Sequence, residues 1–364
     1  MRRAILVVLD GCGAGAAPDW REYGDLPDAD TLRHVVEAAG PLHAPRLFAS
    51  GFLPGEASGL PGFAVEHGRL RPISAGKDSV TGHWEMMGAI LKAPFPTYPN
   101  GFPAELVREF EARIGRTVLG NVAASGTEII ARLGEQSRAE GRPILYTSAD
   151  SVFQLAAHEE SIPLAELYAM CATAREMTTV GRVIARPFAG PSGAFARTEN
   201  RKDYPAAPPP NLCDEIGPRL GGVYGIGVVP ELFGGRAFRP VRRTQSNPEH
   251  EAMLLEALAS DARFIWANFE DFDMKYGHRN DPDGFARCLE AFDRTLERLL
   301  TELREDDLLI LTADHGNDPT DASTDHNREY VPFTTIRRGE GLQNRGDRDG
   351  FALVGEAVRL HLNP

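Results

Sequence analysis

Cysteine is scarce in this sequence, and long apolar runs are absent from it. The chain of 364 residues has four cysteines, and no two of them form a CxxC pair: Cys12, Cys171, Cys213 and Cys288. Scattered thiols exclude a zinc knuckle or a disulfide framework and are typical of a reducing compartment. No apolar stretch approaches the roughly 20 residues that a membrane span needs, and the short run before Asp10 does not end in a secretory cleavage site. We therefore expect a cytoplasmic protein with no membrane partner.

An excess of positive charge is also lacking. The 39 lysines and arginines stand against 52 aspartates and glutamates, which gives a formal charge of −13. Nucleic-acid phosphates need a basic face, so the composition predicts no nucleic-acid partner. A small phosphorylated substrate stays compatible with this charge, because a metal site supplies local positive charge inside an acidic protein. The oligomeric state is left open by the composition.

The two ends of the chain contain the pattern of a parallel α/β core. Residues 3–9 (RAILVVL), 264–269 (FIWANF) and 308–312 (LLILT) are continuous apolar runs, as in strands that are buried on both faces. Between the last two, Asp281 and Pro282 predict a helix start, and apolar residues then recur at helical spacing. Strand, helix and strand form a parallel crossover unit, so these parts predict a doubly wound α/β core.

The middle of the chain differs in composition from the ends. Proline-rich stretches at 93–103 and 205–211 favour extended, semi-rigid chain, because proline removes a backbone donor and fixes φ. Between them the sequence predicts helices and short strands, at 104–114, 164–179, 144–146 and 181–185.

This contrast predicts two domains. We interpret residues 94–211 as an α+β cap domain inserted into a core domain made of residues 1–93 and 212–364. The alternative is that the prolines lie in ordinary surface loops of one large domain.

Acids and histidines follow the three apolar runs. Six of them have the right type and place for a metal site: Asp10, Asp273, His278, Asp314, His315 and His326. In open parallel sheets the carboxyl ends of the strands form the ligand crevice, so we expect these side chains at one edge. Carboxylate oxygen with imidazole nitrogen, and no thiolate, favours manganese, zinc or iron over calcium.

Each of these residues alone has an ordinary explanation. Asp10 with Gly11 could be only a turn after a strand, and one of Asp271 and Asp273 could merely cap a loop. Other histidines could be ordinary polar or core residues: His34, His83, His158 and His250. Six potential ligands at three predicted strand ends nevertheless favour a metal site over solvated loop residues.

A second group lies at residues 75–88 (AGKDSVTGHWEMMG). Ser79 comes just before an apolar helical face, where a hydroxyl commonly acts as an N-cap. The same place suits a nucleophile, because a helix N-terminus stabilises phosphate and a metal lowers the pKa of a bound hydroxyl. The glycines of residues 13–18 fit neither the Walker pattern nor the dinucleotide fingerprint.

Long ordered motifs resemble phosphopentomutase, a family of the alkaline phosphatase superfamily. The resemblance runs from Val8 to about Phe333 and covers core and cap alike. It implies an alkaline-phosphatase-like doubly wound core with an inserted cap. The matching stretches are KDSVTGHWE, TSADSVFQ, RVIARPF, RTENRKDY, DFDMKYGHRND, TADHGNDPT and TDHNREYVPF.

The resemblance implies two Mn²⁺ ions, with other divalent ions possible. Carried over by position, one ion would be held by the nucleophile's oxygen together with Asp10, Asp314 and His315. The other would be held by Asp273, His278 and His326.

The resemblance also implies an activity and a partner. The family interconverts (2-deoxy)ribose 1-phosphate and (2-deoxy)ribose 5-phosphate, so the partner would be a small phosphorylated sugar. Catalysis would pass through a phosphoserine at Ser79 and a sugar bisphosphate, with a 1,6- or 1,5-bisphosphate as activator. Asp150 and Arg201 match substrate-binding positions, and arginine suits forked contact with phosphate.

The sequence departs from the family pattern in three places. Ser79 stands where the family usually has threonine, and Thr81 is the alternative nucleophile. Val228 follows Gly227 where the family tends to carry lysine, and residues 246–253 (SNPEHEAM) replace its usual SNxDGM. Three rivals therefore stay open: a phosphatase with water as acceptor, a mutase of another sugar phosphate, and a catalytically silent binding protein.

Overall fold

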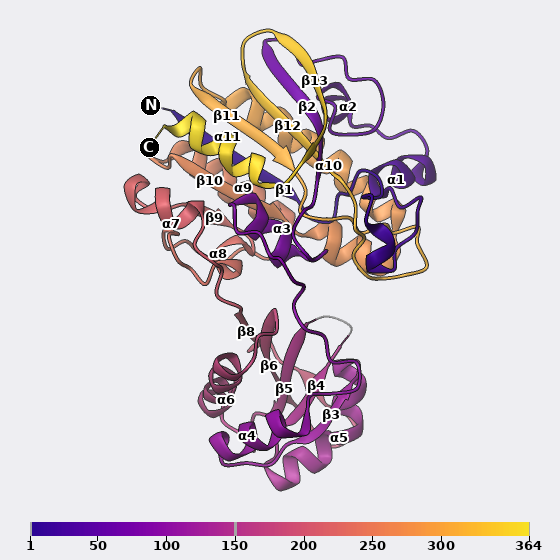
Figure 1. The fold of residues 1–364 in the computed structure, drawn as a ribbon, viewed down its shortest axis with the longest axis vertical. Helices are drawn as coiled ribbons and strands as arrows, with labels where there is room; N and C mark the ends of the chain where they lie inside the picture. The colour runs from indigo at the N-terminus through magenta and orange to yellow at the C-terminus, as the bar shows by residue number, and fades with distance from the viewer. Residues whose placement is uncertain (1, 149–150, 364) are drawn as a thin grey trace. The chain divides into compact units, whose positions relative to one another are not determined.

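The structure, a computed structural model, describes residues 2–148 and 151–363. The chain divides into two compact units (Figure 1), one made of Met1–Pro94 with Pro208–Pro364 and the other of Phe95–Ala207. Across the described ranges, no helix combines the length and the apolar character needed to cross a membrane.

A mixed sheet forms the centre of the larger unit. Within the described residues it has seven strands in the order β13-β2-β12-β11-β1-β10-β9. The neighbours β11, β1, β10 and β9 run parallel, whereas β12 is antiparallel to both β11 and β2. In that order the strands are Gly341–Asp349, Phe63–Arg71, Val331–Arg338, Asp307–Thr312, Arg3–Leu9, Phe264–Phe269 and Tyr224–Ile226.

The predicted doubly wound α/β core is confirmed. Every residue of β1, β10 and β11 is buried, as their continuous apolar runs predicted. Figure 1 shows helices on both faces of this sheet: α9 (Asn247–Ala259) and α10 (Pro282–Glu302) lie on one face, and α11 (Ala352–Leu362) lies on the other. The Asp281 side chain caps α10 by accepting the Gly284 N–H at 2.8 Å.

The edge strand β13 has a different basis. All nine of its residues are exposed, and its sequence GLQNRGDRD has no apolar alternation. Ion pairs join it to β2: Arg69 with Asp347 at 2.7 Å, Arg71 with Asp349 at 2.7 Å and Arg345 with Glu66 at 3.0 Å. Charged side chains on an exposed edge also oppose pairing with other chains.

The smaller unit has its own sheet and its own core. In the described residues its main path is β3-β4-β5-β6-β7, and β8 pairs with β6. The helices are α4 (Ala104–Ile114), α5 (Gly126–Glu140) and α6 (Leu164–Met177), which confirms the predicted helix at 104–114. The second predicted helix ends at Met177 rather than residue 179, because Thr178 is extended. The strands are Leu119–Ala123, Ile144–Thr147, Val152–His158, Arg182–Ala189, Ala196–Arg197 and Lys202–Pro205.

Candidate metal centre

Donor atoms from the ends of β1, β10 and β11 gather in two overlapping groups. One group is Asp10, Asp273 and His315, and the other is Asp273, His278 and His326. Within each group one ligand atom per residue lies within 4.8 Å of the others. Asp273 is common to both groups, so the two groups are neighbours.

Distances within the cluster are short. His315 Nε2 lies 3.3 Å from Asp10 Oδ1 and 3.3 Å from Asp314 Oδ2. His278 Nε2 lies 3.2 Å from Asp273 Oδ2, and His326 Nε2 lies 3.4 Å from Asp273 Oδ1. The structure therefore brings together the six side chains that the sequence singled out.

Local backbone geometry explains why these acids converge. Gly11 has a φ of +76°, and its N–H donates to Asp314 Oδ1 at 3.1 Å. A Cβ at Gly11 would come within 3.3 Å of Asp273, so glycine permits the close approach of the two strand ends. Asp273 itself lies in a π-helical turn, Phe272–Tyr276, a geometry that is frequent at functional sites.

Asp271 and Asp273 differ in their contacts. Asp271 Oδ2 accepts the Asn247 N–H at 3.1 Å and lies 2.9 Å from Lys275 Nζ. Asp271 thus anchors a loop, whereas Asp273 faces the imidazoles.

Buried carboxylates in this cluster influence one another's protonation. Burial, with the charge of Asp314, raises the pKa of Asp10 to about 6. Burial also acts on Asp314, but the charge of His315 and the contact with His83 outweigh it and lower that pKa to about 2. The pKa of His315 is raised well above its usual value by the surrounding acids, against the effect of burial. A cluster of buried acids and histidines that raises one carboxyl pKa and lowers another is typical of functional sites.

Unsatisfied oxygens test whether the cluster fits cations. Asp10 Oδ1 and Asp314 Oδ2 are buried and have no hydrogen-bond partner among the described residues. A buried carboxylate oxygen is costly unless it is paired or coordinates a metal. The donor set and these oxygens therefore fit divalent cations.

Ser79 begins helix α3 (Ser79–Met86) and faces the same cluster. Its Oγ lies 3.1 Å from His315 Nε2. The N-cap interpretation of Ser79 is wrong, because the cap is Asp78, whose side chain accepts the Thr81 N–H at 3.1 Å. Thr81 is 2% exposed, and its hydroxyl donates to Asp78 at 2.7 Å, so Ser79 is the better placed of the two hydroxyls.

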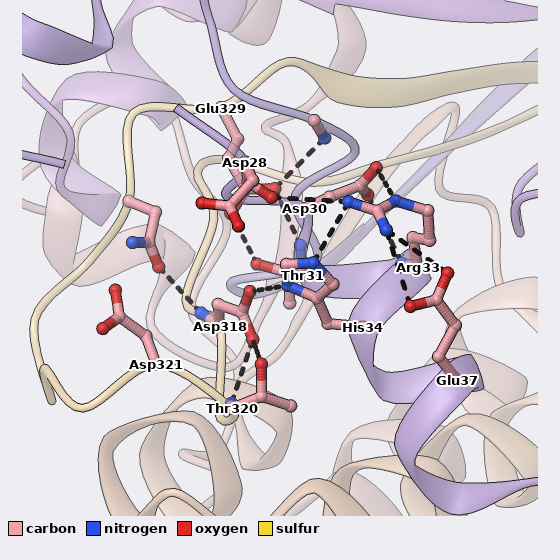
Figure 2. Close-up of polar contacts among 12 residues, drawn as sticks. Asp28, Asp30, Thr31, Arg33, His34, Glu37, Asp318, Thr320, Asp321 and Glu329 are labelled. Carbon is pink, nitrogen blue, oxygen red and sulfur yellow. Dashed lines mark hydrogen bonds and ion pairs between the residues drawn. The ribbon is translucent and has the colours of Figure 1, made fainter. Parts of the chain in front are cut away.

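A chain of hydrogen bonds holds the Asp273 side chain in place. Asn317 Nδ2 donates to Asp273 Oδ1 at 2.6 Å, and the Asn317 N–H donates to Thr31 Oγ1 at 3.1 Å. Figure 2 shows the next link, where the Thr31 hydroxyl donates to Glu329 Oε1 at 2.7 Å. Burial raises the pKa of Glu329 to about 8. The orientation of Asp273 is thus fixed by side chains that the sequence reasoning did not single out.

Two further contacts hold the segment that carries His326. Figure 2 shows His34 Nδ1 against Asp318 Oδ2, and the Asp318 N–H donates to Asn327 Oδ1 at 2.8 Å. Gly316 and Asn327 exchange backbone hydrogen bonds of 3.1 and 2.7 Å. His34 therefore braces a loop beside the centre.

Arg328 fixes the loop before Ser79. It is 2% exposed, and its guanidinium donates to the carbonyls of Ser74 at 2.7 Å, Gly76 at 2.5 Å and Pro72 at 3.0 Å. The same group pairs with Asp19 at 2.9 Å. Arg328 itself lies inside the matched stretch TDHNREYVPF, which was the available signal, but only the fold shows which carbonyls it contacts.

The remaining predicted residues lie elsewhere. Arg201 belongs to the smaller unit, where it pairs with Asp203 at 2.6 Å. Asp150 lies outside the described residues. His158 is a buried core histidine of the smaller unit, packed edge-on against Phe188.

Comparisons with known proteins agree with this geometry. Residues 237–363 match the model of the Metalloenzyme superfamily. The structure of PH0037 protein from Pyrococcus horikoshii is similar with a TM-score of 0.50 at 16% identity, covering 100% of this chain and 97% of that one. Fold and donor set thus define a metalloenzyme with an α/β fold and a dependence on divalent metal, and the predicted α/β fold class is confirmed.

Curated relatives give the family. The chain is 45% identical over 373 residues to the phosphopentomutase of Clostridium acetobutylicum, covering 98% of this chain and 94% of that protein. It is 48% identical over 370 residues to the phosphopentomutase of Caldanaerobacter subterraneus subsp. tengcongensis, covering 98% and 93%. The chain therefore belongs to the phosphopentomutase family, as the motifs predicted. It is a phosphomutase and hence an isomerase.

Proposed function

We propose that this enzyme interconverts (2-deoxy)ribose 1-phosphate and (2-deoxy)ribose 5-phosphate, with Ser79 as the phosphate carrier. The observation that carries the proposal is the place of Ser79, at the first turn of α3 and 3.1 Å from His315. The names of the curated relatives support the pentose phosphate as substrate. Four free cysteines support a reducing, cytoplasmic setting.

Two Mn²⁺ ions, or other divalent ions, are the proposed cofactors. Asp10, Asp314, His315 and the Ser79 oxygen would hold one ion, and Asp273, His278 and His326 would hold the other. When bound, such a pair offsets the charge of a transferring phosphoryl group and acidifies a bound hydroxyl. The donor group of Asp273, His278 and His326 supports the second set, and the 3.3 Å distances from His315 Nε2 to Asp10 and Asp314 support the first.

The chain's own groups account for the transfer. The N-terminus of α3 directs backbone N–H groups and the positive end of its dipole towards an anion at Ser79. The phosphoryl group moves from Ser79 Oγ to the free hydroxyl of the sugar phosphate, which gives up its proton as the serine oxygen regains one. The resulting bisphosphate then returns its other phosphate to Ser79, so no phosphate is lost to water. A sugar 1,6- or 1,5-bisphosphate would phosphorylate an unloaded enzyme.

The insertion at residues 94–211 is proposed to be the substrate-binding domain. Arg201 would contact the substrate phosphate, together with Asp150. Two further arginines lie near Arg201, since burial and the charges of Arg201 and Arg197 lower the pKa of Arg186 to about 10. Mutually repelling guanidinium groups on one sheet suit a multiply charged anion.

A single assay tests the proposal. Ribose 1-phosphate is supplied with Mn²⁺ and a catalytic amount of glucose 1,6-bisphosphate, while ribose 5-phosphate and inorganic phosphate are measured in the same tube. We expect isomerisation without phosphate release. Stoichiometric release of phosphate would instead identify a phosphatase, and the absence of both products would identify a mutase of another sugar phosphate.

A further inference from the structure

Two departures from the family pattern, Val228 and residues 246–253, meet at one side chain. The Val228 N–H donates to Glu270 Oε1 at 2.5 Å. His250, from the altered stretch, places its Nε2 3.7 Å from the same oxygen. Glu270 directly follows β10, three positions before Asp273, so this contact lies beside the metal centre.

His250 is built into this place rather than exposed to solvent. Its side chain is 0% exposed, and Nδ1 lies 2.8 Å from Thr244 Oγ1, which also accepts the Gly227 N–H at 3.2 Å. Nε2 is buried without a hydrogen-bond partner in the described chain. Burial lowers the pKa of His250 to about 4, although the charges of Asp271 and Glu249 act in the opposite direction and that of Lys275 adds to the lowering. The imidazole is therefore neutral, and its free nitrogen is directed at Glu270.

Glu270 lies at the boundary between this buried group and the surface. Its side chain is 17% exposed, and Oε2 makes no hydrogen bond to any described residue. Burial, with the charges of Asp10 and Glu231, raises its pKa to about 8, and the hydrogen bond from the Val228 N–H and the charge of Arg243 oppose this. A carboxyl group accepts a hydrogen bond in either protonation state and also donates one when it is protonated.

The backbone brings Glu270 close to the ligand Asp10. Asn268 Nδ2 donates to Asp10 Oδ2 at 2.6 Å. A Cβ at Gly227, whose φ is +74°, would meet Glu270 Oε1 at 2.6 Å and the Asn268 carbonyl oxygen at 2.7 Å. Gly227 thus permits the close approach of its backbone to Glu270 and to Asn268, the residue that donates to Asp10.

We propose that Glu270, positioned by Val228 and His250, is a specificity-determining residue that binds an uncharged hydroxyl of the substrate beside the metal centre. A phosphate at this place is disfavoured, because the negative charge of Asp10 acts on Glu270 and Val228 supplies no side-chain charge. A substrate hydroxyl can form hydrogen bonds with a carboxyl group. A site that binds a hydroxyl in this way discriminates strongly against analogues that lack the hydroxyl. The inference rests on the proposed function, since it names the part of the sugar phosphate that is recognised.

The test compares Glu270→Leu and Glu270→Gln with wild type and with Glu256→Gln. Glu256 is an exposed acid of α9 that pairs with Arg242 at 2.7 Å, so its variant is a control for loss of an acid. KM and kcat are measured for ribose 1-phosphate and for 2-deoxyribose 1-phosphate, and bound manganese is measured for each protein. We expect Glu270→Leu to raise KM about tenfold, with a smaller change in kcat and unchanged manganese content. Glu270→Gln keeps a hydrogen-bond donor and an acceptor, so its KM should be close to that of wild type.

The two sugars locate the hydroxyl. If Glu270→Leu raises KM only for ribose 1-phosphate, the bound group is the 2-hydroxyl. An equal rise in KM for both sugars identifies another hydroxyl. A KM within twofold of wild type for both sugars in Glu270→Leu, or loss of manganese in that variant, would overturn the inference. Failure of wild type and Glu256→Gln to isomerise either sugar would instead overturn the proposed function.

Discussion

The centre and the edge of the sheet in the larger unit differ in burial and in what they contribute. Strands β1, β10 and β11 are wholly buried and end in the residues of the metal centre, whereas β13 is wholly exposed and joined to β2 by ion pairs. At the buried centre the charge state of each ionisable group depends on its neighbours. The reason is that low-dielectric surroundings strengthen the attraction between charges and raise the cost of desolvating each charge. At the edge, solvent screens the charges. The same kind of residue should therefore matter greatly at the centre and little at the edge.

Ser79→Ala should produce the largest effect. Removing the oxygen that carries the phosphoryl group should lower kcat by at least about 10³-fold, while manganese content and thermal unfolding stay near wild type. Ser79→Thr keeps an oxygen at that place and should retain measurable turnover. Near-normal isomerisation by Ser79→Ala would show that another group carries the phosphate.

Asp273→Ala should have the second largest effect on kcat. Both groups of donor atoms include Asp273, so this variant should lose one bound ion. Its kcat should decrease by about 10²-fold or more. The matched control is Asp271→Asn, two positions away, which should keep both ions. Metal analysis of the purified proteins makes the comparison, and two bound ions in Asp273→Ala would refute the ligand assignment.

Thr31→Val tests whether the buried hydrogen-bond network affects metal binding at the centre. The change removes the link between Glu329 and Asn317, so we expect about tenfold weaker manganese binding. Stability should fall by about 1–3 kcal/mol, since buried partners are left unsatisfied. Manganese titration and urea unfolding measure the two effects. A drop in stability with unchanged manganese affinity would limit Thr31 to a structural role.

Arg345→Ala probes the edge and should have the smallest effect. Its ion pair with Glu66 spans exposed side chains, and exposed pairs contribute little to stability. We expect unchanged kcat and KM and a thermal midpoint close to that of wild type. Loss of activity in this variant would mean that β13 supports the centre after all, and the contrast between the two regions would fail.

The centre of the sheet was predictable because its sequence signal is local. A strand buried on both faces must be apolar throughout, so 3–9, 264–269 and 308–312 identified β1, β10 and β11, and acids at strand ends indicated the ligands. The edge was not predictable, because β13 has a single large apolar residue, Leu342, and no apolar alternation. It is held by partners about 280 positions away, such as Glu66 for Arg345 at a separation of 279.

The supporting side chains were missed for a related reason. Thr31, Asn317 and Glu329 are ordinary polar residues whose importance comes from contacts across 286 and 298 positions. The choice of Asp78 over Ser79 as the N-cap was missed because both residue types cap helices equally well. Spacing along the chain gives the type of ligand and the strand it follows, and tertiary contacts give the hydrogen bonds that orient it.

Phosphorylation of Ser79 is the central claim, and peptide mass spectrometry tests it most directly. The enzyme loaded with Mn²⁺ is incubated with glucose 1,6-bisphosphate, digested, and the peptide that contains Ser79 and Thr81 is sequenced in parallel with that of Ser79→Ala. The account predicts one phosphoryl group on Ser79 in the wild type and none on this peptide in the variant. A phosphoryl group on Thr81 or on another residue, or an unmodified peptide from an enzyme that isomerises ribose 1-phosphate, would contradict it.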